Sequence, residues 1–201
     1  MILLVFVGFL GSGKTTLILD LARQLAADGR RSCIIVNEVG EIGIDQQVLA
    51  ESGMPVRELV AGCICCQITV DLITTLQEVA AAFAPDIVLV EASGVAAPPA
   101  ILEALSYYPG ERFAAVHTVA VVDPTRFEAL HEVLQPLIES QIAAADRIVI
   151  TKIDEAGVAQ VAETERTVRR LNTGAPVDQV SPGHSLELSA LLPGAYPKRG
   201  R

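Results

Sequence analysis

The fold is decided near the start of the chain, where Ile2-Leu3-Leu4-Val5-Phe6-Val7 runs directly into Gly8-Phe9-Leu10-Gly11-Ser12-Gly13-Lys14-Thr15. The first six residues form a continuous apolar run, which is typical of a buried strand in a parallel sheet. The next eight match G-x-x-x-x-G-K-[ST], a pattern whose glycines let successive backbone N–H groups turn towards phosphate oxygens. Leucines then recur at helical spacing as far as Gly29, which fits a helix C-cap. Strand, glycine loop and helix in this order predict a phosphate-binding loop, or P-loop.

The residue types in this loop predict which side chains bind phosphate and which bind Mg²⁺. The Lys14 ammonium is expected to reach the β- and γ-phosphates, and the Thr15 hydroxyl is expected to bind Mg²⁺. The helix that begins near Lys14 adds the positive end of its dipole. The residues predicted to contact the phosphates are Gly11, Ser12, Gly13, Lys14, Thr15 and Thr16.

The rest of the chain alternates short apolar runs with helical patterns. Alternation of this kind predicts the α/β class, with a mostly parallel sheet flanked by helices. Ligands bind such sheets at the carboxyl ends of the strands, so the loops that follow the strands are expected to converge on one edge. The further strands are expected at 33–36, 56–60, 87–90, 118–122, 147–150 and 177–180, and the further helices at 68–83, 138–145 and 158–171.

Length and composition limit the class of protein. The 201 residues fit one domain, predicted over residues 1–191, with a flexible C-terminal tail at residues 192–201 that is rich in proline and glycine. The net charge of −9 argues against a nucleic-acid partner. No apolar stretch reaches the roughly 20 residues that a membrane span needs. The apolar start carries neither a basic residue nor a cleavage site, so a cytoplasmic protein is expected.

A second recognition segment, Thr151-Lys152-Ile153-Asp154, follows the apolar run at 147–150. Such a segment suits guanine, because the Asp154 carboxylate can accept from two N–H groups on the base edge while the lysine stem covers the ring. Adenine has no such donor pair and would leave the carboxylate unpaired. A second wall of the base pocket is predicted from Ser181, Pro182 and Gly183 after the last strand.

Three thiols lie close together in Gly62-Cys63-Ile64-Cys65-Cys66. Clustered thiolates bind zinc and similar metals, so Cys63, Cys65 and Cys66 are candidate ligands, with small buried residues as the alternative interpretation. Cys33 lies inside an apolar run and is expected in the core. The loop at 37–45 carries Glu38 and Glu41, which could touch a metal or could form a solvated acidic loop.

An acid also follows the predicted strand at 87–90, in Glu91-Ala92-Ser93-Gly94. A carboxylate at this point of a P-loop protein holds the Mg²⁺ shell and the attacking water. Lys14 and Glu91 are therefore the predicted catalytic residues, and Thr15 and Glu91 the predicted magnesium ligands.

Taken together and in this order, these segments resemble the CobW-like metallochaperone GTPases, relatives of the GTPases that mature urease and nickel hydrogenase. The resemblance rests on GFLGSGKTT at 8–16, NEVGEIGID at 37–45, GCICC at 62–66, VEASGVAAP at 90–98, VVD at 121–123 and TKID at 151–154. It implies a three-layer P-loop fold of the SIMIBI type and Mg²⁺-dependent hydrolysis of GTP. It also implies zinc, cobalt or nickel at the cysteine motif, with Glu38 or Glu41, for delivery to a client metalloprotein. A homodimer that depends on nucleotide or metal is implied as well.

Three other functions stay open from the sequence. One is a GTPase chaperone for a cofactor-dependent enzyme of the cobalamin type, with structural cysteines. Another is a non-catalytic zinc buffer or sensor, and the third is a small-molecule kinase, for which no arginine-rich lid is visible. Many members of the family carry a second domain and a histidine-rich stretch, whereas this chain has only His117, His131 and His184.

Overall fold

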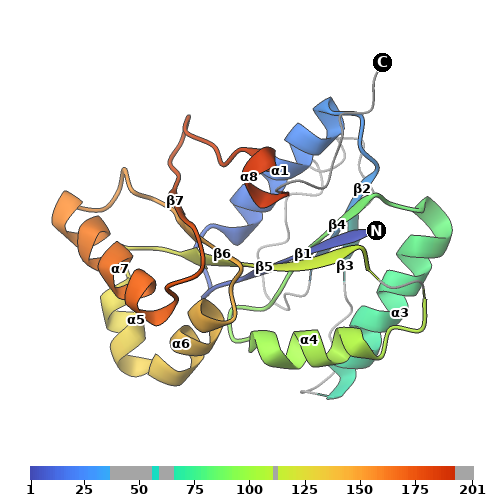
Figure 1. Cartoon of the computed structure of the whole chain (residues 1–201), viewed down its shortest axis with the longest axis horizontal. Helices are drawn as coiled ribbons and strands as arrows, with labels where there is room; N and C mark the ends of the chain where they lie inside the picture. Colours follow the sequence, from blue (N-terminus) through green and yellow to red (C-terminus); the bar gives the residue numbers. More distant parts are fainter. Residues whose placement is uncertain (37–55, 59–65, 111–112, 193–201) are drawn as a thin grey trace.

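The computed structural model describes residues 1–36, 56–58, 66–110 and 113–192, with residues 56–58 and 66–70 described as backbone only. Within these ranges the chain alternates strands and helices around one sheet (Figure 1). The strands are β1 (Ile2–Val7), β2 (Ser32–Val36), β3 (Val56–Glu58), β4 (Ile87–Glu91), β5 (Ala115–Val122), β6 (Arg147–Ile150) and β7 (Val177–Gln179). The helices are α1 (Lys14–Ala27), α3 (Cys66–Phe83), α4 (Pro98–Ser106), α5 (Phe127–Val133), α6 (Gln135–Ala143), α7 (Val158–Leu171) and α8 (Leu188–Leu191).

The seven described strands form a single sheet in the order β3-β2-β4-β1-β5-β6-β7. Every described pair of strands is parallel, which confirms the predicted sheet. Because all strands run the same way, all their carboxyl ends lie on one edge. β1, which leads into the phosphate loop, occupies the middle of the sheet between β4 and β5.

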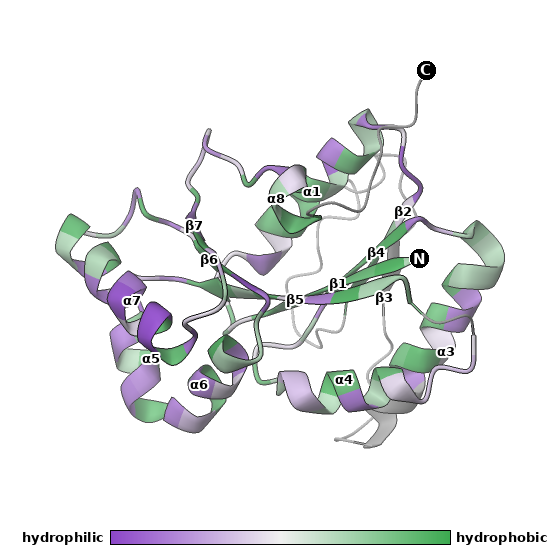
Figure 2. Cartoon of the chain, viewed as in Figure 1, coloured by the Kyte–Doolittle hydropathy of each residue, from purple (hydrophilic) through white to green (hydrophobic). Residues whose placement is uncertain are grey.

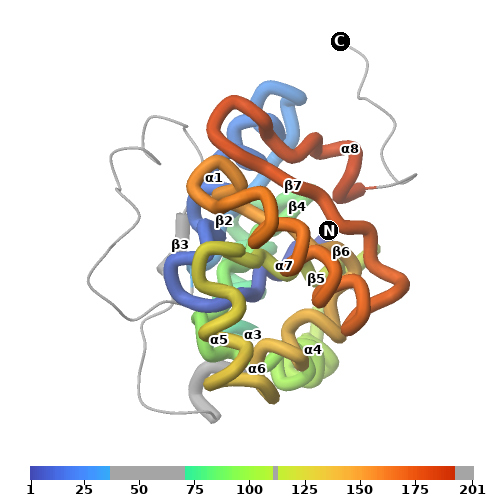
Figure 3. The backbone as a smooth tube through the Cα atoms, turned by 90° about the vertical axis from the view of Figure 1, so that its left-hand side faces the viewer, coloured from blue at the N-terminus to red at the C-terminus, as the bar shows by residue number. Residues whose placement is uncertain are grey.

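Alternate residues of the strands face opposite sides, so the sheet separates two apolar clusters. On one side Leu4 and Phe6 of β1 pack with Leu17, Leu21 and other residues of α1 and α8. On the other side the second set of β1 side chains packs with residues of α3, α4, α5, α6 and α7. Figures 1 and 3 show these helices on opposite sides of the sheet, which gives the three layers expected of the fold.

The hydropathy of the residues agrees with these two apolar clusters (Figure 2). The central strands are apolar, whereas the helices carry both apolar and polar residues. Cys33 is fully buried in β2, as the sequence predicts for a core residue. None of the helices in the described ranges is long and apolar enough to cross a membrane.

The predicted elements are present, with differences at their ends. The helix expected at 138–145 is α6, which starts earlier, at Gln135, with a proline in its first turn, and ends at Ala143. The strand expected at 118–122 begins at Ala115, because β5 pairs with β1 from Ala115 onwards. The predicted strand at 56–60 is described only as far as Glu58. Three further helices, α4, α5 and α8, were not predicted from the sequence.

Candidate functional site

The phosphate loop connects β1 to α1 through three glycines with positive φ. The angles are +141° at Gly8, +77° at Gly11 and +92° at Gly13, and all three lie in the range that residues with side chains rarely adopt. Gly13 caps α1 without any side-chain hydrogen bond to the first turn, so no side chain caps the N–H groups at that helix start. Helix starts of this kind bind phosphate, and the loop therefore fits the predicted ligand.

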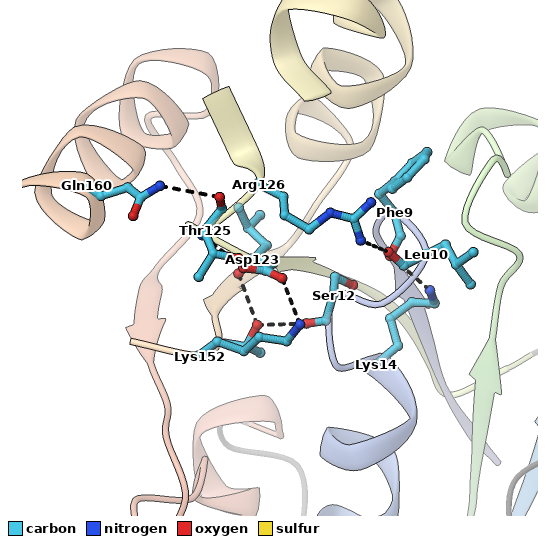
Figure 4. Close-up of polar contacts among 11 residues, drawn as sticks. Phe9, Leu10, Ser12, Lys14, Asp123, Thr125, Arg126, Lys152 and Gln160 are labelled. Atoms are coloured by element: carbon cyan, nitrogen blue, oxygen red, sulfur yellow. Dashed lines mark hydrogen bonds and ion pairs between the residues drawn. The ribbon is translucent and has the colours of Figure 1, made fainter. Parts of the chain in front are cut away.

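Lys14 folds back over the loop that precedes it. Its buried ammonium donates to the backbone carbonyl of Gly8 at 3.0 Å and to that of Phe9 at 3.4 Å (Figure 4). The positive charge is thereby held inside the curl of the loop. This position suits a lysine that binds phosphate oxygens.

Thr15 and Glu91 meet at the carboxyl end of β4, next to the loop. The Thr15 hydroxyl lies 2.8 Å and 3.0 Å from the two carboxylate oxygens of Glu91, to which it donates. The Glu91 side chain is buried, with 1% of the residue exposed. A hydroxyl and a carboxylate are oxygen ligands of the kind that Mg²⁺ prefers, so the pair fits the predicted ion.

The segment after β6 is tied directly to the phosphate loop. The Thr151 hydroxyl lies 2.7 Å from the carbonyl of Ser12 and 3.2 Å from that of Val122. A β-carbon added at Gly13 would lie 3.5 Å from the Thr151 methyl group, so the Thr151 side chain lies directly beside the phosphate loop. The base-reading segment and the phosphate loop thus form one connected unit.

Lys152 is held by an acid that lies at the end of β5. Its ammonium lies 2.8 Å from the Asp123 carboxylate, which also accepts from the Thr125 amide at 2.9 Å and the Thr125 hydroxyl at 2.6 Å (Figure 4). Burial raises the pKa of Asp123, but the hydrogen bonds from Lys152 and Thr125 outweigh it and leave the pKa below its ordinary value. Lys152 itself has a φ of +50°, an unusual conformation for a residue with a side chain.

A cavity of about 370 Å³ opens beside this unit, between the base-reading segment and α1. Asp154, which is exposed, lies on its lining with Thr151 and Lys152. The turn after β7 forms another part of the lining. The residues that line this base cavity include Gly13, Thr16, Asp20, Arg23, Ser181, Pro182, Gly183, His184 and Leu186. The structure therefore brings together every residue predicted to contact the base.

Three polar side chains near the loop were not predicted from the sequence. Arg126 donates to the carbonyl of Leu10 at 3.2 Å, and its guanidinium lies 5.8 Å from the centre of the Phe9 ring (Figure 4). Gln141 of α6 is buried and donates to the carbonyl of Ala96 at 3.0 Å, in the loop that follows Glu91. Asp123, the third, appears in the sequence only as the end of the VVD motif. Apart from the bonds of Asp123 to nearby Thr125, these contacts join residues 29 to 116 positions apart, so no local pattern reveals them.

The predicted metal ligands fall largely outside the described ranges. Glu38, Glu41, Cys63 and Cys65 lie in segments that the structure does not describe, and Cys66 is described only as the first backbone position of α3. Among the side chains that are described, no group of three or more His, Cys, Asp or Glu residues could hold a metal ion. The cysteine site therefore stays a prediction from the sequence.

Comparison with known proteins places this geometry in a family. The chain is 33% identical over 200 residues to the zinc chaperone CobW of a Sinorhizobium species, which covers 83% of this chain and 56% of the relative. It is 30% identical over 185 residues to the zinc chaperone YjiA of Escherichia coli, with 88% and 56% covered. The chain thus spans about half the length of the curated relatives it matches.

A solved structure shares the fold. The crystal structure of the Zn(II)-bound YjiA GTPase from Escherichia coli superposes with a TM-score of 0.66 at 24% identity, covering 95% of this chain and 60% of that one. Residues 2–179 match the family described as CobW/HypB/UreG, nucleotide-binding domain. That span runs from β1 to the end of β7 and contains the phosphate loop, Glu91 and the base-reading segment. The chain belongs to the CobW/HypB/UreG family, and its described fold is the nucleotide-binding domain of that family.

Proposed function

We propose that this chain binds and hydrolyses GTP and uses that cycle to control the binding and delivery of a transition metal to a client protein. The observation that carries the nucleotide part is the hydrogen bond of 2.7 Å between Thr151 and the Ser12 carbonyl. It joins a phosphate loop to a segment that lines the base cavity, so one ligand with both a phosphate chain and a base fits the site. Asp154 on the lining favours guanine over adenine, because only guanine offers the carboxylate two donors.

The catalytic roles follow from where the side chains lie. Lys14, inside the loop, stabilises negative charge that develops on the transferred phosphoryl group. Glu91, buried beside Thr15, orients the attacking water. Thr15 and Glu91 would hold Mg²⁺, which would neutralise charge on the β- and γ-phosphates.

The metal part is supported by the register of the sheet. Val36, the last residue of β2, pairs with Glu91 on one side and with Glu58, the last residue of β3, on the other. The two segments that carry the candidate metal ligands follow Val36 and Glu58 directly in the sequence. A change at Glu91 on hydrolysis can therefore reach both segments through adjacent strand ends. Zinc is the proposed cargo because the relatives are named zinc chaperones, with cobalt and nickel as alternatives.

The nucleotide part is tested by phosphate release from GTP and from ATP, each with Mg²⁺. We expect turnover of GTP that exceeds that of ATP, and a reduction of about 100-fold in the Lys14→Ala variant, which controls for contaminating hydrolases. Equal turnover of the two nucleotides would overturn the proposed guanine specificity. Turnover that survives in Lys14→Ala would exclude the phosphate loop as its source.

The metal part is tested by elemental analysis of protein loaded with Zn²⁺, Co²⁺ or Ni²⁺, beside Cys65→Ser and Cys33→Ser. Cys65→Ser is expected to lower the metal bound per chain, and to change GTP turnover in the presence of metal. Cys33→Ser is the matched control, because Cys33 is buried in the core and is not a proposed ligand. Unchanged metal stoichiometry in Cys65→Ser would contradict the metal part and leave the nucleotide part standing.

A further inference from the structure

The wall of the base cavity that follows β7 is attached to α1 by one amide side chain, Gln24. Its Nε2 donates to the carbonyl of Leu186 at 2.9 Å, and its Oε1 accepts from the amide of Leu188 at 3.0 Å. The amide thus binds both a donor and an acceptor of the backbone, across more than 160 residues of sequence. A contact of this kind fixes the position of a backbone segment in two directions.

The segment that leads into the residues held by Gln24 is exposed from Pro182 to Ser185. Its tip is a tight turn, in which Ser181 and His184 exchange backbone hydrogen bonds of 3.3 Å and 2.9 Å. The base cavity lies against one side of the turn, and a second, open hollow of about 750 Å³ lies against the other. Both hollows are lined by Gly183, His184 and Leu186. The turn is therefore positioned mainly by its two ends.

One end of the turn continues the sheet, where the Val180 amide donates to the Ile150 carbonyl at 2.9 Å. At the other end the Leu186 side chain is buried in the apolar cluster under α1, and Gln24 binds its carbonyl. Burial of a leucine is non-directional, whereas the amide sets the distance and angle between the wall and α1.

Gln24 also contacts a lining residue of its own helix. Its Nε2 lies 3.1 Å from a carboxylate oxygen of Asp20, one helical turn earlier on α1. Asp20 on α1 and Leu186 after β7 both line the base cavity. A single amide group therefore joins a lining residue of α1 to the lining segment that follows β7.

We propose that Gln24 is a positioning residue that sets the width of the base cavity and thereby the preference for guanine over adenine. The inference rests on the proposed function, in which this cavity holds the base. Removal of the amide lets the wall at 181–186 move away from α1 while Leu186 stays buried. The guanine edge then meets Asp154 less well, and the penalty against adenine decreases.

The test compares Gln24→Leu with the wild type by calorimetric titration with GDP, ADP and pyrophosphate. We expect GDP to bind roughly 5- to 30-fold more weakly, the size expected when two hydrogen bonds that position a site are lost. The GDP/ADP affinity ratio should fall by a similar factor. Pyrophosphate, which fills only the phosphate loop, should bind within about twofold of wild type. In GTP turnover KM should rise by more than kcat falls.

Gln135→Leu is the matched control, because it removes an exposed amide bonded to Glu139 on α6 and should leave the affinity ratio unchanged. Should Gln24→Leu fail to fold, Gln24→Met is measured instead, since its side chain has a similar length and keeps the packing. A folded variant with an unchanged GDP/ADP ratio overturns the inference. A wild type that binds no guanine nucleotide overturns the proposed function instead, so the two failures are distinguishable.

Discussion

At the scale of single residues, the site contains an ion pair between two side chains that are distant in sequence. Asp123 and Lys152 come from the ends of two adjacent strands, β5 and β6, and form an ion pair of 2.8 Å. Only 5% of Asp123 is exposed. Because Lys152 holds an unusual backbone conformation two residues before Asp154, this pair supports the shape of the segment that is predicted to read the base.

The lowered pKa of Asp123 leads to a prediction about acid stability. A carboxyl group whose pKa is lower in the folded than in the unfolded state stabilises the fold above its unfolded pKa, and this stabilisation is lost as the pH falls through the folded pKa. We therefore expect Asp123→Asn to lower the free energy of unfolding by about 1 kcal/mol at neutral pH. The difference from wild type should be smaller at an acid pH, below the ordinary carboxyl value of 3.8, than at neutral pH.

Urea unfolding at both pH values measures this difference. The control is Glu163→Gln, which removes an exposed carboxylate that pairs with Arg166 on the same helix. An exposed pair contributes little, so the control should stay within about 0.5 kcal/mol of wild type at both pH values. An equal loss of unfolding free energy in Asp123→Asn at both pH values would contradict the lowered pKa of Asp123.

The sequence predicts the residues of the phosphate loop because their roles are local, and Gly11, Ser12 and Gly13 act together with their immediate neighbours. It does not predict that Arg126 lies on the Leu10 carbonyl or that Gln141 binds the Ala96 carbonyl. Those contacts depend on how β5, α6 and the loops come together. Polar residues of this kind in a loop or on a helix are indistinguishable in sequence from solvated ones.

At the scale of secondary structure, the junction of β1 with the loop is the most constrained point. A β-carbon built on Gly8 would lie 2.2 Å from the carbonyl oxygen of Val121 on β5, a distance that real β-carbons do not adopt. The loop can therefore leave β1 along this path only because residue 8 has no side chain. Gly94 has the same role from the other side, since its β-carbon would lie 2.6 Å from the Leu10 amide nitrogen.

Gly8→Ala is accordingly expected to lower the free energy of unfolding by about 2–4 kcal/mol, because backbone must move to remove the clash. Gly29→Ala is the matched control: Gly29 also has a positive φ, of +68°, but nothing lies within 4 Å of its β-carbon. Only the conformational strain applies there, about 1 kcal/mol. Chemical denaturation of both variants tests the prediction, and equal losses would show that the close approach to Val121 contributes nothing.

The strands were predictable because buried strands of a parallel sheet are continuous apolar runs, as in β1 and β4. The strand order was not, since no local pattern shows that β4 lies between β2 and β1. The helices that were not predicted lack a clear helical pattern in the sequence. α4 begins with two consecutive prolines, and α5 is short and is separated from α6 only by Leu134.

At the scale of the whole molecule, the phosphate loop and the base cavity belong to one folded unit, so nucleotide should stabilise all of it. A ligand at 100 times its Kd adds about 2.7 kcal/mol to the stability of the state that binds it. For a domain of this size that corresponds to a rise in Tm of roughly 5–10 °C. We expect this rise with GDP, and a smaller one with ADP at the same concentration.

Thermal unfolding followed by circular dichroism, with each nucleotide and with none, measures the shift. CDP is the control, since its base lacks the pair of donors that Asp154 is proposed to bind. An equal rise with GDP and CDP would place the whole effect in the phosphate loop and contradict base recognition. Because the chain spans about half of its relatives, the same measurement on the full length of a relative would show whether further segments respond.

The hydrogen bond between Thr151 and Ser12 has a consequence for the shape of the ligands that the molecule can accept. In the proposed function this contact fixes the separation between the phosphate site and the base site, so we expect the length of a ligand to affect its binding. A nucleoside alone or a bare phosphate chain can occupy only half of this fixed length. We therefore expect selection by ligand length in addition to selection by the chemistry of the base.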